Sequence, residues 1–149
     1  IQKLKKEHPT RFVGGLVNGD FERQYAPSLV MDKTLSAKPY YLRSLKKATI
    51  GIASPGIFES IGWKFTEYIV SGMSVVTSPF EEILIDSDFK ELHNYLTYTT
   101  PEEALDKVEI LLTNPQLKAS QMKANLRFYK NNIHPVAVMR KIIHTVLEK

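Results

Sequence analysis

Two glutamates, Glu59 and Glu67, flank the start of an expected helix, and their spacing suits a ligand with two polar ends. The amino end of a helix offers unpaired N–H groups and a partial positive charge, which together favour phosphate. Glu67 lies roughly 8 Å further along the helix axis, at ~1.5 Å per residue. A carboxylate there can accept hydrogen bonds from a diol such as ribose, and Glu59 can do so for a sugar ring. A nucleoside diphosphate sugar presents these groups in that order.

The helix that carries Glu67 is expected over residues 61–71, directly after a strand and a Pro-Gly turn. Its apolar residues fall on one stripe, which should pack against a sheet: Ile61, Phe65, Tyr68 and Ile69. Gly62 lets a ligand approach the backbone closely. Gly72 can end the helix in a left-handed conformation.

Each of these residues also has an ordinary structural interpretation. Glu67 can be a solvated helix residue paired with Lys64, three positions earlier, and Glu59 can simply complement the helix dipole. Lys64 is either a surface lysine or a partner for pyrophosphate. Trp63 either packs against the protein or stacks on a base or sugar.

The rest of the chain alternates short β-branched runs with longer amphipathic ones, which predicts an α/β domain with a mainly parallel sheet covered on both faces. We expect strands over residues 11–17, 27–32, 50–54, 74–78 and 94–98. Helices are expected over residues 39–47, 61–71, 101–113, 116–130 and 134–148. In such sheets ligands bind beyond the carboxyl ends of the strands, so the crossing that contains Glu59 and Glu67 is well placed.

The composition excludes several classes of protein. The 149 residues are 43% hydrophobic and 24% charged, which is typical of one globular domain rather than a disordered chain. No apolar run reaches the ~18 residues of a membrane-spanning helix. The chain has no cysteine, so disulfides and thiolate metal sites are excluded, and the four histidines have no metal-ligand spacing. The net charge of +4 is too small to indicate nucleic acid as a partner.

The segment from Glu59 to Glu67 reads E-S-I-G-W-K-F-T-E, an E-x7-E pattern followed by Gly72 and a β-branched run. It resembles the nucleotide-sugar half of GT-B glycosyltransferases of the group 1 type. The resemblance extends roughly from residue 11 to the carboxyl end, with its specificity concentrated in residues 54–72. The chain departs from the family pattern after Glu67 (Y-I-V-S) and at Met73, near where proline is common.

This resemblance implies a Rossmann-like three-layer domain in which residues 1–149 bind the nucleotide-sugar donor. It implies that Glu59 is the catalytic-site glutamate that holds the sugar, and that Glu67 binds the ribose. The backbone of Ser60, Ile61 and Gly62 would meet the diphosphate. Sugar transfer with retention is implied, without a metal or another cofactor.

The sequence supplies only some of the other residues that the family uses to bind the donor. Family members take an arginine and a lysine for the pyrophosphate from a loop and helix that this sequence does not supply, and Lys64 is a substitute. Gly14 and Gly15 permit a loop near the donor site. Trp63 is a stacking candidate.

The chain starts at Ile1 with residues typical of the middle of a helix, so we expect a piece of a longer, two-domain chain. The other half would bind the glycan or lipid-linked acceptor, and this piece alone would be inactive. We expect a cytoplasmic location, with peripheral membrane contact through basic clusters as an option. The alternatives are a non-catalytic interaction module and an enzyme that binds another phosphorylated ligand.

Overall fold

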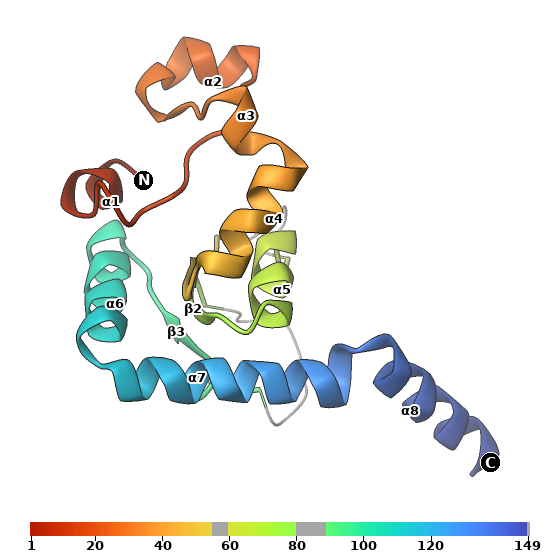
Figure 1. The fold of residues 1–149 in the computed structure, drawn as a ribbon. Coiled ribbons are helices and arrows are strands. Elements are labelled where there is room, and N and C mark those ends of the chain that lie inside the picture. The colour runs from red at the N-terminus through yellow and green to blue at the C-terminus, as the bar shows by residue number, and fades with distance from the viewer. Residues whose placement is uncertain (55–59, 80–88, 149) are drawn as a thin grey trace. The chain divides into compact units, whose positions relative to one another are not determined.

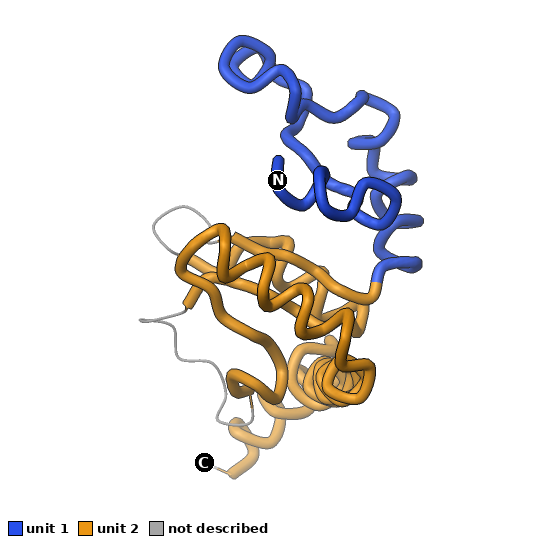
Figure 2. Tube along the Cα trace, turned by 90° about the vertical axis from the view of Figure 1, so that its left-hand side faces the viewer, with its two compact units in different colours: residues 1–48 blue, residues 49–149 orange. Residues whose placement is uncertain are grey.

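The chain forms two compact units, residues 1–48 and residues 49–149 (Figure 2). The structure is a computed structural model, and it describes residues 1–54, 60–79 and 89–148. Each unit is described by itself below.

Residues 1–48 fold into short helices joined by loops (Figure 1). The helices are α1 (Gln2–Glu7), α2 (Asp20–Tyr25), the 3-10 turn η1 (Pro27–Leu29), α3 (Lys33–Ser36) and α4 (Lys38–Lys47). α4 confirms the helix predicted over residues 39–47. Its proline lies in the first turn, where the missing N–H costs nothing, and Lys46 and Lys47 lie in its last turn.

The strands predicted over residues 11–17 and 27–32 are wrong. These segments meet only at a single parallel bridge between Leu16 and Val30. The Leu16 N–H donates to the Leu29 carbonyl at 2.8 Å, and no ladder extends from there. The apolar run is also not a buried one, since Val13 and Val17 are 59% and 72% exposed. A strand needs a neighbour along its length, and a 3-10 turn occupies the segment that would have supplied one.

Residues 49–149 contain a small parallel sheet. Its strands are β1 (Ile50–Ile52), β2 (Ser74–Thr77) and β3 (Tyr95–Thr97), in the spatial order β1-β2-β3. Gly51 pairs with Val75, and Val76 pairs with Leu96, both in parallel ladders. The three strands predicted over residues 50–54, 74–78 and 94–98 are therefore confirmed, and so is their parallel arrangement.

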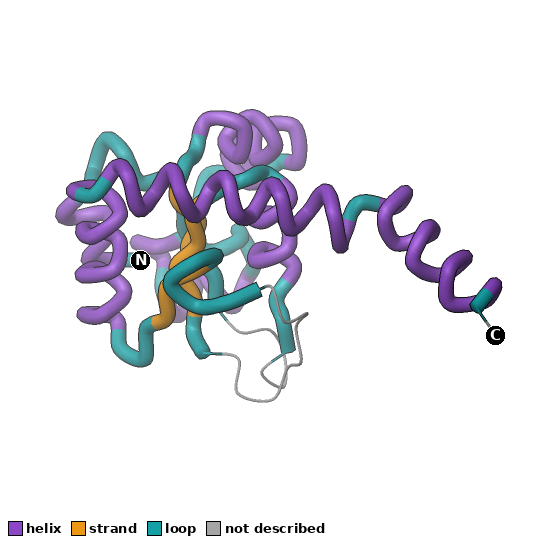
Figure 3. The backbone as a smooth tube through the Cα atoms, turned by 90° about the horizontal axis from the view of Figure 1, so that it is seen from below, coloured by secondary structure: helices purple, strands orange, loops and turns teal. Residues whose placement is uncertain are grey.

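The helices of this unit also follow the sequence pattern (Figure 3). They are α5 (Trp63–Val70), α6 (Pro101–Thr113), α7 (Pro115–Phe128), the π-helical turn η3 (Tyr129–Ile133) and α8 (Pro135–Leu147). Thr100 and Asn114 cap α6 and α7 by accepting hydrogen bonds from backbone N–H groups. Within the described residues, none of the helices is both long enough and apolar enough to cross a bilayer.

The core of this unit forms around β2, whose four residues are all buried, so both faces of this strand are covered. Helices α5, α6 and α7 all contact β2. On the α5 side, one cluster of buried apolar side chains joins the sheet to the helices, and it consists of Ala53, Phe65, Ile69, Val75, Phe89 and Phe128. This packing fixes α5 against the sheet.

Candidate functional site

Helix α5 begins at the carboxyl edge of the sheet. It joins the parallel strands β1 and β2, so it runs against their direction and its amino end lies where the strands end. Gly62 is the N-cap residue, with an extended backbone, and its carbonyl accepts a hydrogen bond from the Phe65 N–H at 3.0 Å. Gly62 has no side chain and therefore cannot cap the helix with a side-chain hydrogen bond. The backbone N–H groups of a first helical turn have no partner within the helix itself, and anions commonly bind there.

Apolar side chains hold this helix start in place. Phe65 and Ile69 are buried in the core cluster, and Ile61 packs against it from the loop before the helix. The Tyr68 ring lies over Gly51 of β1, where an added Cβ would come within 2.4 Å of the ring. The packing of Ile61 therefore ties the segment just before α5 to the core.

Glu67 lies on the solvent side of α5, with its side chain 28% exposed. Its Oε2 atom is 3.7 Å from Nζ of Lys64, whose side chain is 54% exposed. This is the contact expected of a surface ion pair, and such pairs add little to stability. Burial raises the pKa of the Tyr68 hydroxyl, and the negative charge of Glu67 raises it further. Both interpretations of Glu67 remain compatible with this arrangement.

Trp63 is 88% exposed, which excludes core packing as its role. It is the first residue of α5 and lies one turn before Glu67, on the same side of the helix. An indole in this position offers a flat apolar surface next to the helix start. Trp63, Lys64 and Glu67 are thus brought together by one short helix.

The structure does not bring the other predicted site residues together with Trp63, Lys64 and Glu67 in the same way. Glu59 lies outside the described residues, so its role stays a prediction. Ser60 is exposed just before the helix. Gly14 and Gly15 lie in the unit of residues 1–48. Gly14 packs against the Phe12 ring, and a Cβ on Gly15 would come within 2.6 Å of the Leu29 carbonyl oxygen.

Two hydroxyls at the end of β2 were not singled out by the sequence. Thr77 Oγ1 and Ser78 Oγ are buried and have no hydrogen-bond partner within the described residues. Thr77 ends β2 at the carboxyl edge where α5 begins. Buried hydroxyls usually have partners, so this edge is unusual. The only sequence signal was a Thr-Ser pair at the end of a predicted strand.

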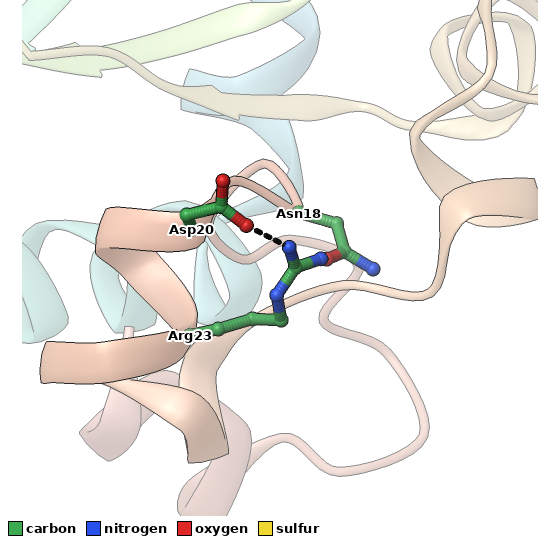
Figure 4. Close-up of polar contacts among 3 residues, drawn as sticks. All are labelled: Asn18, Asp20 and Arg23. Carbon is green, nitrogen blue, oxygen red and sulfur yellow. Dashed lines mark hydrogen bonds and ion pairs between the residues drawn. The ribbon is translucent and has the colours of Figure 1, made fainter.

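Two further arrangements bear on ligands. Where the structure describes the chain, no three His, Asp or Glu side chains gather in a way that could hold a metal ion. In residues 1–48, the Arg23 guanidinium donates to Asn18 and Asp20 (Figure 4). These groups are exposed and pair with one another near the start of α2, so they are a local surface contact rather than a ligand site.

Comparison of the chain with models of known protein families, with curated proteins and with solved structures finds no significant match.

Proposed function

We propose that this chain is the donor-binding domain of a GT-B glycosyltransferase. The intact enzyme transfers a sugar from a nucleotide-sugar to a glycan, lipid-linked or small acceptor, with retention. The observation that carries the proposal is the placement of α5. Its amino end lies at the carboxyl edge of a parallel sheet, with Glu67 on its solvent side. The E-x7-E resemblance selects a nucleotide-sugar among the ligands that such an edge can bind.

Each part of the donor then has a partner with suitable chemistry. The backbone of residues 60–62 and the dipole of α5 offset the negative charge of the diphosphate, so no metal is needed for this purpose. Lys64 adds a positive charge beside it. The carboxylate of Glu67 accepts hydrogen bonds from the ribose hydroxyls. Trp63 offers a stacking surface for the base or the sugar. Glu59 completes the proposed site as the glutamate that holds the sugar.

The proposal also implies the finer architecture of a Rossmann-like domain with three layers. The buried β2 and the helices in contact with it support this arrangement. The acceptor would bind to a separate half of the enzyme, so we expect donor binding without turnover from these 149 residues.

The test is the thermal stability of the chain during titration with UDP, GDP and their sugars. A ligand at ~100 times its dissociation constant should stabilise the fold by about 2.7 kcal/mol. Glu67→Ala should abolish this shift, because the ribose loses its acceptor. Asp106→Ala removes the same charge from an exposed position of α6 and should leave the shift unchanged.

Uridine and guanosine separate the two roles on α5. Their binding should depend on Glu67 but not on Lys64, whereas Lys64→Ala should weaken binding only of the diphosphates. If no nucleotide stabilises the chain, or if Glu67→Ala keeps the full shift, the donor-binding proposal fails.

A further inference from the structure

Helix α8 exposes an unusually large apolar surface. It leads away from the sheet and from α5, α6 and α7 in the same unit (Figures 1 and 3). None of its 13 residues is buried. Its large apolar side chains are 38% to 79% exposed, and they are Val136, Val138, Met139, Ile142, Ile143, Val146 and Leu147. Together they present on the order of 700 Å² of apolar surface, above the 300–600 Å² of the largest patch on a typical monomer.

These side chains lie on one face of the helix. At ~100° per residue they cover about half of its circumference. A seam runs along the centre of this face, with residues spaced by three, four and three positions, namely Val136, Met139, Ile143 and Val146. This spacing is that of a helix packed along another helix. A shallow, open depression on the same face is lined by Val136, Met139, Arg140 and Ile143 together with Pro135.

The polar side of α8 interacts with the chain itself. Lys141 donates to the Asn132 side chain at 2.6 Å, and His144 Nδ1 is 3.0 Å from Glu148 Oε2. Helices that lie on anionic membranes carry a strongly basic polar face, with Trp, Phe or Leu opposite to it. α8 carries only two arginine or lysine residues, Arg140 and Lys141, and contains neither Trp nor Phe, so a lipid surface suits it poorly.

The seam is complementary to itself. Its four residues are placed symmetrically about position 141. An antiparallel pair of α8 helices therefore brings Val136 against Val146 of the second copy, and Met139 against Ile143 of the second copy. This arrangement also sets the positive end of each helix dipole beside the negative end of the other.

We infer that two copies of this chain associate through an antiparallel, two-fold pairing of their α8 helices. The exposed apolar area approaches the ~800 Å² that each partner contributes to a stable interface. The seam contains no charged residue, so its burial leaves no charge without a partner. The inference does not depend on the proposed enzymatic function.

Sedimentation equilibrium of the 149-residue chain between about 1 and 200 μM tests the association. We expect a reversible dimer with a dissociation constant in the micromolar range, about −8 kcal/mol. Ile143→Asp should raise this constant at least ~30-fold, as for a residue central to an interface. Thr145→Asp adds the same charge to the same helix outside the seam, and it should change the constant less than ~3-fold. Circular dichroism should show equal helix content in all three proteins, because both positions are exposed.

Cross-linking tests the direction of the pairing. The chain has no cysteine, so introduced thiols are unique. A mixture of the Val136→Cys and Val146→Cys chains should form a mixed disulfide under mild oxidation, whereas neither chain alone should cross-link efficiently. Disulfides between two Val136→Cys chains would overturn the antiparallel arrangement.

A monomer over the whole concentration range would overturn the inference. An equal increase of the dissociation constant in Ile143→Asp and Thr145→Asp would overturn it too. Vesicles of phosphatidylglycerol provide a further comparison. If the chain stays monomeric and binds these vesicles in a manner that depends on Ile143, the face is a lipid-binding surface instead.

Discussion

At the scale of single residues, Glu103 shows how one carboxylate organises a helix start. Its Oε2 atom accepts hydrogen bonds from the N–H and the hydroxyl of Thr99, at 2.7 and 2.8 Å. Its own N–H donates to Oγ1 of the capping Thr100 at 3.2 Å. The backbone hydrogen bond from Thr99 is the main cause that holds the pKa of Glu103 below its ordinary value of 4.5. The charged form is therefore the form that the fold favours.

This lowered pKa gives a dependence of stability on pH with a definite sign. Glu103 contributes stability above its ordinary pKa, and this contribution is lost as the pH falls through the lower pKa of the folded state. Glu103→Gln should therefore be less stable than the parent chain at pH 7, and the difference should shrink toward pH 3. Urea unfolding at several pH values measures this difference. A difference for Glu103→Gln that is independent of pH would contradict the assignment.

Residue-scale features were predictable from the sequence only where the partners are local. The start of α6 depends on Thr100 and Glu103, three positions apart, and the sequence predicted it. The exposure of Trp63, and the Thr77 hydroxyl that has no hydrogen-bond partner among the described residues, depend on what packs around them from distant segments. The proposal that Glu67 binds a ligand rests on resemblance, because its contact with Lys64 is also that of an ordinary surface pair.

At the scale of elements, α7 is held to the sheet by a buried amide. Asn125, which has no exposed surface, donates from Nδ2 to the Met73 carbonyl at 2.7 Å and to the Asn94 carbonyl at 2.9 Å. Its Oδ1 accepts from Nδ2 of Asn94 at 3.0 Å. One side chain of α7 thus satisfies the backbone just before β2 and just before β3, the two strands that it crosses.

Replacing this amide should destabilise the fold strongly. Asn125→Leu keeps a similar volume but leaves two buried carbonyls and the Asn94 amide without their partner, at a cost of about 2–4 kcal/mol. Urea unfolding monitored by circular dichroism measures this loss. Gln116→Leu changes an exposed amide on the same helix and should alter stability by less than ~0.5 kcal/mol. A similarly small effect of Asn125→Leu would show that the buried network adds little.

The elements that the sequence predicted correctly are those whose partners lie nearby in the chain. Strands β1 and β2 are joined by one helix, so local pattern and turn residues define the whole unit. The run at residues 11–17 is just as apolar, but it finds only one bridge partner, at Val30. A pattern of apolar residues indicates burial on average, and it does not reveal whether a neighbouring strand exists. The pairing of Asn94 with Asn125, 31 positions apart, leaves no periodic signal at all.

At the scale of the whole molecule, the division into two units predicts that the sheet can fold without residues 1–48. The main core cluster lies entirely within residues 49–149, from Ala53 to Phe128, and so do both ladders of the sheet. Residues 49–149 expressed alone should therefore unfold in one cooperative transition, with a urea dependence of about 1–2 kcal/mol per M. Coincident transitions by far-UV and near-UV circular dichroism are the measurement. In the full chain, hydrogen exchange should be slower in β2 than in α2, which contains no buried residue. A broad transition without cooperativity would mean that the first 48 residues complete the core, and the two units would then be one folding domain.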